Sequence, residues 1–181
     1  MQNWDMTASP LQKIFCFGSN SRMQNPPTVS HLLGEIAWLF TQSKLHRQLP
    51  LATLEIIAMP ALLKEQLWIF RDKDQPVGAA FWAYCNEEAA KKLDRGVFAS
   101  GEVFSTDDWN SGDEIWLVDL VAPFATEENK HVQLMIADLA AGPLSGKAFK
   151  FHQTDPATGK KVVVEIDEKA GERLKAAQNA G

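Results

Sequence analysis

The sequence predicts a single domain of the α/β (α+β) class, with a mixed, mostly antiparallel central sheet flanked by helices. Two observations lead to this prediction. Runs of β-branched and aromatic residues alternate with segments whose apolar residues recur at helical spacing, in the order helix, three strands, helix, strand, helix, two strands, helix. The chain has 181 residues, 45% hydrophobic and 23% charged, which is enough to bury a core without disulfides or metals.

The N-terminal part of the chain divides into a leader and the start of the domain. Residues 1–29 contain the turn-rich stretch "GSNSRMQNPP" and are predicted to be a flexible leader, whereas residues 30–181 form the folded domain. The first helix is expected to begin with Ser30 as its N-cap and to end before Pro50, which cannot continue a helix. Its apolar face consists of Leu32, Leu33, Ile36, Ala37 and Phe40.

Three strand-like runs and a short helix follow. The runs are residues 54–59 ("LEIIAM"), 66–72 ("QLWIFRD") and 77–85 ("VGAAFWAYC"). Pro60 ends the first run, and the turn "KDQP" joins the other two as a hairpin. The helix "EEAAKKLDRG" then stops at Gly96, the usual C-terminal glycine position. Mixed signals in residues 97–108 predict a loop with at most one short strand.

A buried strand with a carboxylate inside it dominates the next part of the chain. The stretch "WNSGDEIWLVDLVAPF", residues 109–124, combines a turn, in which Asp113 is a turn residue, with an apolar run interrupted by Asp119. Alternation predicts that Asp119 shares a face of the sheet with Ile115, Leu117 and Val121. An isolated ionised carboxylate costs several kcal/mol in such a place, so Asp119 needs a partner or a function.

The C-terminal third supplies the remaining elements. An amphipathic helix over residues 127–142 ends at Gly142, and two strands, "KAFKFHQ" and "KKVVVEI", flank the turn "DPATG". A polar helix is predicted for residues 167–178. This gives two helices and two strands after the central strand.

Composition excludes several classes of protein. No run approaches the ~20 apolar residues of a membrane span, and "MQNWDMTASPLQ" is unlike a signal peptide, so a cytoplasmic location is expected. A net charge of -5 does not favour binding to nucleic acid. Cys16 and Cys85 are far apart in apolar surroundings and are expected to be reduced, packed thiols rather than a disulfide or a zinc site.

Among the four histidines, His46 is the candidate for chemistry. It lies in "SKLHRQLP" near Ser43 and Arg47, and a buried carboxylate such as Asp119 could hold its imidazole in one tautomer as a general base. The alternatives remain open: His46 as a histidine at a helix end, and Asp119 as a structural residue bonded to backbone N–H groups or to Arg47. The other histidines are expected at the surface or in packing: His31, His131 and His152.

The order of elements resembles the GNAT acyltransferase fold. In that fold a glycine-rich loop after the central strand holds the pyrophosphate of coenzyme A. The corresponding stretch here, "APFATEENK", has no glycine and places two acids at the start of the following helix. Coenzyme A is therefore not the expected donor.

Two motifs resemble the RTX-toxin-activating lysine acyltransferases of the hemolysin-activating type. The family pattern Ser-x-x-His-Arg matches Ser43, His46 and Arg47. The second pattern, Trp-x-x-Gly-Asp-x-x-Trp-x-x-Asp-x-x-Ala-Pro-Phe, matches Trp109, Gly112, Asp113, Trp116, Asp119, Ala122, Pro123 and Phe124. The likeness, which includes "LGEIAWLF" and "QPVGAAFWA", extends from about Leu33 to Phe124 and thins in the acidic C-terminal third.

The resemblance implies an enzyme that moves a fatty acyl group from acyl carrier protein to internal lysine ε-amines of an RTX protoxin or a related large protein, activating it. It implies His46 as the base and Asp119 as the residue that orients it, supported by Arg47 and by Ser43, which either hydrogen-bonds or acts as a nucleophile. No bound cofactor or metal is expected, and a homodimer is consistent with the family. A catalytically inactive module that binds an acyl carrier or a partner, and a thioesterase-like hydrolase, are the alternatives.

Two further expectations concern the substrates. The acyl chain needs an apolar channel, for which the candidate walls are Trp38, Trp68 and Trp82, with Phe40 and Phe81; the alternative is that these residues form core. Acyl carrier proteins are acidic, and a basic patch would help to dock one. The candidates for that patch are Lys44, Arg47, Arg71 and Lys73.

Overall fold

A computed structural model of the protein describes residues 27–97, 103–154, 158 and 160–173, and in them one five-stranded sheet in the order β1-β2-β3-β4-β5. The strands are β1 (Leu67–Asp72), β2 (Gln75–Cys85), β3 (Glu114–Val121), β4 (Phe149–Thr154) and β5 (Lys161–Ile166). β3 and β4 pair in parallel, and the other neighbours are antiparallel. The predicted fold class, including its likeness to the GNAT fold, is therefore confirmed.

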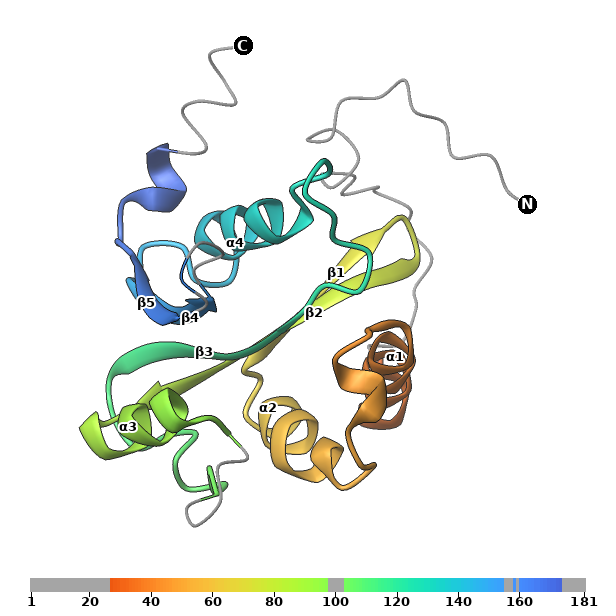
Figure 1. Cartoon of the computed structure of the whole chain (residues 1–181), viewed down its shortest axis with the longest axis horizontal. Helices are drawn as coiled ribbons and strands as arrows, with labels where there is room; N and C mark the ends of the chain where they lie inside the picture. The colour runs from red at the N-terminus through yellow and green to blue at the C-terminus, as the bar shows by residue number, and fades with distance from the viewer. Residues whose placement is uncertain (1–26, 98–102, 155–157, 159, 174–181) are drawn as a thin grey trace.

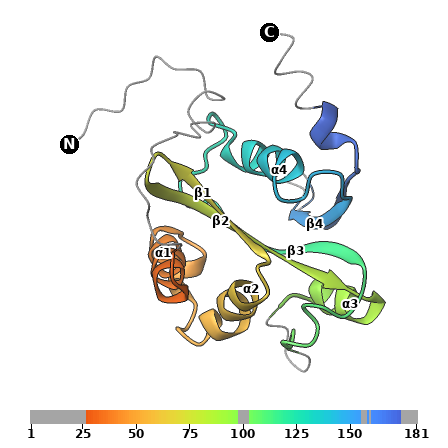
Figure 2. The same cartoon turned by 180° about the vertical axis from the view of Figure 1, so that it is seen from behind.

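Helices cover both faces of this sheet. They are α1 (Val29–Gln42), α2 (Met59–Leu63), α3 (Glu87–Arg95) and α4 (His131–Ala141), with a 3-10 turn at His46–Gln48 and a π-helical turn at Leu54–Ala58. α1, α2 and α3 lie on one face and α4 on the other (Figures 1 and 2). Each face has its own buried core, called here the α1-face core (with Ile36, Phe81 and Trp116) and the α4-face core (with Trp82, Leu117 and Ile136).

The N-cap of the first helix lies two residues earlier than predicted. Thr28, in an extended conformation, caps α1 by accepting a hydrogen bond from the His31 N–H at 3.2 Å, and Ser30 lies inside the helix. The following stretch corrects a second prediction, because "LEIIAM" is helical rather than a strand. Its buried residues Ile57, Ala58, Ala61 and Leu62 recur at helical spacing and pack into the α1-face core. Pro60 stands in the first turn of α2, where its missing N–H costs nothing.

A β-bulge in β3 corrects the predicted face of Asp119. Phe81 pairs with Asp119 while the next residue of β2, Trp82, pairs with Leu117, so Val118 is an extra residue. Leu117 belongs to the α4-face core, whereas Val121 belongs to the α1-face core. The bulge therefore breaks the alternation that was expected to group Asp119 with Ile115 and Leu117, and turns Asp119 to the α1 face, where its partner Phe81 is buried.

Most of the other predicted elements agree with the structure. The hairpin β1-β2, helix α3 and strands β4 and β5 are confirmed, and Gly96 follows α3 with a φ of +107°. Helix α4 starts at His131, so Glu127 and Glu128 precede its first turn. Residues 170–173 are helical, and the rest of the predicted last helix lies outside the described residues, as do residues 1–26 of the predicted leader. In the described ranges, no helix has the length and apolar character needed to cross a membrane.

Candidate active site

The loop that leaves α1 folds back on itself and brings Ser43 to His46. The helix ends at Gln42, and Ser43 is extended (φ −81°, ψ 127°) with its N–H still bonded to the Leu39 carbonyl at 3.1 Å. A 3-10 turn then starts at His46. His46 therefore follows the helix and does not end it. This path places Ser43 Oγ 2.7 Å from His46 Nδ1, and both residues are buried.

The other ring nitrogen of His46 meets Asp119. His46 Nε2 lies 3.0 Å from Asp119 Oδ2, across 73 positions of sequence, so the predicted contact is confirmed. The imidazole is 5% exposed and the Asp119 side chain 21% exposed, so the carboxylate is the more solvent-exposed group of the pair. Asp119 Oδ1 accepts the Leu120 N–H at 2.8 Å. Both carboxylate oxygens are therefore engaged, which offsets the cost of partial burial.

These contacts determine how protons are arranged at the site. An ionised Asp119 can only accept, so Nε2 of a neutral His46 carries the proton and donates it. Nδ1 is then unprotonated and accepts the Ser43 O–H. Carboxylate, imidazole and hydroxyl thus form one hydrogen-bonded chain, the same order of groups as in a Ser-His-Asp triad but with the two ring nitrogens exchanged. Such a chain can remove a proton at Ser43 Oγ and hold it on the imidazole.

Aromatic packing fixes the imidazole in this position. The Phe40 ring lies 4.9 Å from the His46 ring, centroid to centroid, and is itself buried. Phe81 stands opposite Asp119 on β2 and is fully buried. A histidine ring enclosed in this way has few alternative rotamers, so its two hydrogen bonds are held in place before any substrate arrives.

The other residues predicted for the site are spread over the molecule. Arg47 is exposed, and the described bonds of Asp119 go to His46 and Leu120. Trp38 is on α1, 36% exposed, with its ring 6.1 Å from that of Phe124. Trp68 and Trp82 belong to the α4-face core on the opposite face of the sheet. The three tryptophans named as channel walls are therefore not brought together.

The residues proposed as a basic patch differ in their surroundings. Arg71 makes two hydrogen bonds of 2.7 Å to the two oxygens of Glu35, and this arginine lowers the pKa of the Glu35 carboxyl. Lys73 lies in the β1-β2 turn with a φ of +57°, and Lys44 and Arg47 are exposed in the loop of residues 43–48, which holds Ser43 and His46. Lys44 and Arg47 are thus the members of the patch that lie beside His46 in the chain.

The remaining histidines lie away from this chain of hydrogen bonds. His31 is 3.4 Å from Glu35 on the surface of α1. His152 bonds Asp94 at 2.7 Å and stacks on Trp116. Burial lowers the pKa of His131, at the start of α4. Among the described residues, no group of three or more His, Cys, Asp and Glu is arranged to hold a metal ion.

A cavity beside Asp119 was not predicted from the sequence. β3 and β4 pair at Ile115–Phe149 and Trp116–Lys150 and then separate. A cavity of about 630 Å³ lies along the separated parts and reaches Asp119. Its lining residues are Leu93, Gly96, Val97, Leu117, Val118, Asp119, Leu120, Val132, Gln133, Ile136, Phe151, His152, Gln153, Thr154 and Lys161. β3 and β4 are parallel and are not joined by a tight turn, so no local sequence pattern indicated where their pairing ends.

The turn before β3 explains one glycine of the second motif. A Cβ on Gly112 would lie 2.5 Å from the Cys85 carbonyl oxygen and 2.5 Å from the Asn86 nitrogen. Only glycine allows this close approach of the turn to the β2-α3 junction. Asp113, the neighbouring acid of the motif, is exposed, in agreement with its predicted place in a turn. Gly112 therefore has a structural role in the turn that leads into β3. The same motif also contains Asp119, the partner of His46.

Comparison with known proteins identifies the family of this chain. The sequence model described as "HlyC: RTX toxin acyltransferase family" matches residues 25–168. The protein-lysine myristoyltransferase RtxC of Kingella kingae is 31% identical over 129 residues, 66% of this chain and 75% of that protein.

Two other relatives match over a shorter length. The RTX-I toxin-activating lysine-acyltransferase ApxIC of Actinobacillus pleuropneumoniae is 40% identical over 96 residues, 51% of this chain and 52% of that protein. The protein-lysine myristoyltransferase HlyC of Escherichia coli is 33% identical over 93 residues, 51% of this chain and 52% of that protein. The match thus spans about half the length of these two proteins. The family match, which covers most of the chain, shows that this protein belongs to the RTX toxin acyltransferase family.

Proposed function

We propose that this protein transfers a fatty acyl group from the thioester of an acyl carrier protein to lysine ε-amines of an RTX protoxin, or a related large protein, and thereby activates it. The observation that carries the proposal is the hydrogen-bonded chain Asp119–His46–Ser43, a base with its orienting carboxylate. The names of the relatives support lysine as the acceptor, since RtxC and HlyC are named protein-lysine myristoyltransferases.

The acceptor gives the base a defined task. A lysine amine has a solution pKa near ~10.4, so at pH 7 removal of its proton costs about 4.6 kcal/mol over a gap of ~3.4 pH units. General-base catalysis by a positioned histidine typically contributes ~10²–10⁴-fold in rate. A site without such a group would depend on the small neutral fraction of the amine at pH 7.

Because both nitrogens of His46 are engaged, the proton must enter through one of its partners. Asp119 already accepts the hydrogen bond from Nε2–H, so the open route is Ser43, whose oxygen can take a proton from the amine as its own proton passes to Nδ1. The acceptor ammonium first loses one proton to solvent. As the neutral amine attacks, its next proton passes through Ser43 to His46; the N–C bond forms, the C–S bond breaks, and the leaving carrier thiolate takes that proton back along the same route. Asp119 stabilises the imidazolium that exists between these two steps.

The proposed donor and setting follow from the same residues. The stretch between β3 and α4 lacks the glycines with which a backbone cradles a pyrophosphate, which favours a carrier protein over coenzyme A. Lys44 and Arg47 are exposed in the loop of residues 43–48, where they would attract an acidic carrier. We place the reaction in the cytoplasm, and the homodimer implied by the resemblance stays a prediction.

A second candidate function also has an observation in its favour. A serine hydroxyl 2.7 Å from an unprotonated imidazole nitrogen has the geometry of an activated nucleophile. If Ser43 attacked the thioester, an acyl-enzyme would form, and water rather than lysine could then accept the group. The result would be a thioesterase-like hydrolase that uses the same three residues.

One experiment separates the two. The enzyme is mixed with tetradecanoyl acyl carrier protein, with and without unacylated RTX-I toxin as acceptor, and free carrier thiol and intact masses of both proteins are recorded. Direct transfer predicts acceptor-dependent thiol release, tetradecanoyl groups on acceptor lysines and no acyl group on the enzyme. Ser43→Ala should slow transfer by about 10²-fold or more. Rapid thioester hydrolysis with an unmodified acceptor would overturn the proposal in favour of the hydrolase.

A further inference from the structure

We propose that Trp38 of α1 and Phe124 of the loop after β3 form the surface on which the acceptor protein places its lysine, and that Glu127 and Glu128 attract the basic segment that carries this lysine. The inference rests on the proposed acyl transfer and deepens it, because it names side chains that would select the acceptor. The segment of residues 122–130, which joins β3 to α4, is called here the β3-α4 loop.

The two aromatic side chains are exposed and lie outside both cores of the sheet. Trp38 is 36% exposed and Phe124 39% exposed, and neither belongs to the α1-face core or to the α4-face core. Their ring centroids lie 6.1 Å apart, with the rings tilted by 44°. Tryptophan and phenylalanine are enriched in protein–protein contacts, where a few such side chains carry most of the binding energy. The pair is therefore available to a protein partner.

The pair connects the two elements that carry the reacting groups. Trp38 lies in the second half of α1, and the end of this helix leads directly to Ser43 and His46. Phe124 follows Asp119 by five residues (124 − 119) in the segment that leaves β3. Five residues span at most about 18 Å, so a peptide bound to the pair can present a lysine to the hydrogen-bonded chain.

One asparagine holds Phe124 in position. Asn129 Nδ2 donates to the Phe124 carbonyl at 2.7 Å. Asn129 Oδ1 accepts the Thr126 N–H at 2.9 Å and the His131 N–H at 3.1 Å. These bonds tie both ends of the β3-α4 loop to one side chain. The exposed ring is thus positioned before a partner binds, which lowers the entropic cost of binding.

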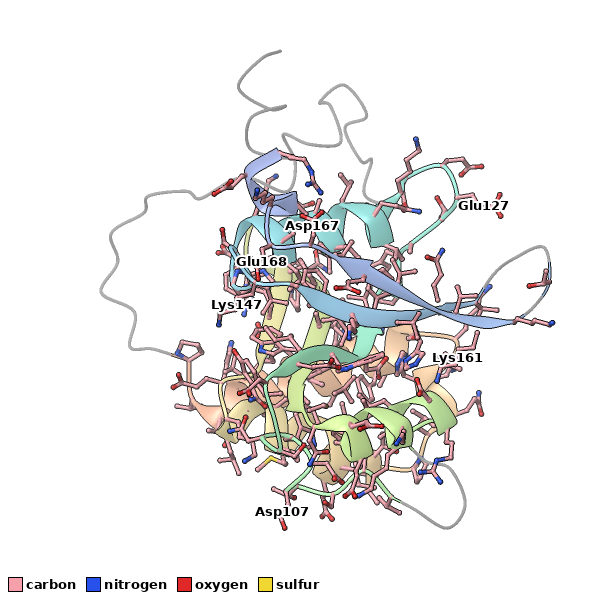
Figure 3. All side chains as sticks on the ribbon, turned by 90° about the vertical axis from the view of Figure 1, so that its left-hand side faces the viewer. Asp107, Glu127, Lys147, Lys161, Asp167 and Glu168 are labelled. Carbon is pink, nitrogen blue, oxygen red and sulfur yellow. The ribbon has the colours of Figure 1, made fainter. Side chains whose placement is uncertain are left out.

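The same loop carries two acids without a cationic partner. Glu127 and Glu128 are exposed, and neither makes an ion pair with any residue in the part of the chain that the structure describes. Lys130 offsets one of the two charges, so the loop stays net negative. Figure 3 shows Glu127 on the outside of this loop, apart from the labelled Lys147 and Lys161.

This combination of rings and carboxylates suits a lysine side chain. The acids attract a basic segment during its approach, and an ammonium is also attracted to the face of an aromatic ring. The four-carbon stem of lysine can lie along the rings of Trp38 and Phe124. That apolar contact persists when the ammonium loses its proton, as the reaction requires.

An acyl carrier protein fits this surface less well. Its acidic side chains and the phosphate of its prosthetic arm would meet Glu127 and Glu128 with charge of the same sign. Lys44 and Arg47, the exposed cations proposed to attract the carrier, lie in the loop of residues 43–48 instead. Donor and acceptor would therefore approach through surfaces of opposite charge.

Affinity for the acceptor, measured without any donor, tests the surface. Unacylated RTX-I toxin is titrated against the wild type, Trp38→Ala, Phe124→Ala and Leu63→Ala, the last a control that removes an exposed side chain of α2. The Kd should rise about tenfold or more in the two aromatic variants and stay unchanged in Leu63→Ala. Trp38→Phe and Phe124→Tyr, which keep a ring, should retain most of the affinity. Thermal unfolding shows which variants are folded.

Two further measurements separate this role from a structural one. At saturating acceptor the two alanine variants should transfer within about threefold of the wild-type rate, with the loss confined to the KM for the acceptor. Toxin acetylated on its lysines should bind the wild type more weakly but bind Phe124→Ala with little further loss.

Wild-type affinity in folded Trp38→Ala and Phe124→Ala, or equal binding of acetylated and unmodified toxin, overturns the inference, as does failure of the wild type to bind the toxin. The proposed acyl transfer is judged separately, by acyl groups on the acceptor, and stands if acylation persists while these affinities do not change.

Discussion

At the scale of single residues, the sequence predicted that His46 and Asp119 are in contact, but it did not predict which ring nitrogen each partner of His46 contacts. Asp119 inside an apolar strand demanded a partner, and the two motifs together indicated His46, which the structure places 3.0 Å away. The role of each ring nitrogen could not be predicted, because it depends on the turn between Ser43 and His46. That turn buries the Ser43 hydroxyl against Nδ1 and makes Ser43 a link in the chain of hydrogen bonds.

Replacement of Asp119 by Asn should lower the rate of transfer by about 10²–10⁴-fold while the protein stays folded. The amide oxygen can still accept a hydrogen bond from Nε2–H, but it carries no charge to stabilise the imidazolium. Single-turnover rates and thermal unfolding of the variant measure both effects. Asp113→Asn is the control, since Asp113 is an exposed turn acid of the same motif. Equal losses in the two variants would contradict the assignment.

The thiol of Cys85 should be inert in the folded protein. Burial, with the nearby negative charges of Asp108 and Glu114, raises the pKa of Cys85 to about 12. At pH 8 only about one thiol in 10⁴ would then be a thiolate, the reactive form. In a Cys16→Ser variant, which leaves Cys85 as the sole cysteine, maleimide should modify the unfolded protein fully and the native protein far more slowly. If maleimide modified Cys85 of the folded protein as fast as a free thiol, Cys85 could not be buried with a raised pKa.

At the scale of elements, local patterns predicted most of the fold, and tertiary packing decided the exceptions. The adjacent Ile56 and Ile57 favoured a strand in "LEIIAM", but its buried Ile57 and Ala58 continue at helical spacing with Ala61 and Leu62 of α2 in the α1-face core. The bulge at Val118 leaves no local signal either, because the run Ile115 to Val121 reads as a regular buried strand. One extra residue nevertheless decides which face of the sheet Asp119 occupies.

The ion pair between Glu35 and Arg71 joins α1, the helix that precedes the loop of Ser43 and His46, to β1. Both ends are partly buried, with side chains 13% and 34% exposed. Removing one partner of such a doubly hydrogen-bonded pair is expected to cost about 1–3 kcal/mol, so Arg71→Ala should lower the free energy of unfolding at pH 7 by that amount. Lys91→Ala, which breaks an exposed pair with Glu87, should leave the free energy of unfolding nearly unchanged.

The same pair should make the free energy of unfolding depend on pH in the acidic range. The hydrogen bonds and charge of Arg71 lower the pKa of Glu35 in the folded state, so its stabilisation is complete above the carboxyl's ordinary pKa and is lost as the pH falls through the lowered folded-state value. The difference between wild type and Arg71→Ala in urea unfolding should therefore shrink in acid. A difference that stays constant from pH 7 to pH 2 would mean that Arg71 acts by packing alone.

At the scale of the whole molecule, two cores on opposite faces of one sheet meet where β3 and β4 separate. The order of elements was enough to predict the class of fold, because short connections and antiparallel hairpins restrict the possible sheets. The separation of the parallel pair and the cavity beside it depend on how α3 and α4 pack against both strands. These features join segments about 60 residues apart, such as Leu93 and Phe151, and no single stretch of sequence encodes them.

The central claim is that the imidazole of His46 is the base for acylation of lysine, and its loss is the most direct test. An acceptor of the RTX class is co-expressed with the wild type, with His46→Ala or with His31→Ala, which removes an exposed histidine of α1. Intact mass should show one fatty acyl group per modified lysine with the wild type and His31→Ala, and none with a folded His46→Ala protein. Undiminished acylation by His46→Ala would contradict the account.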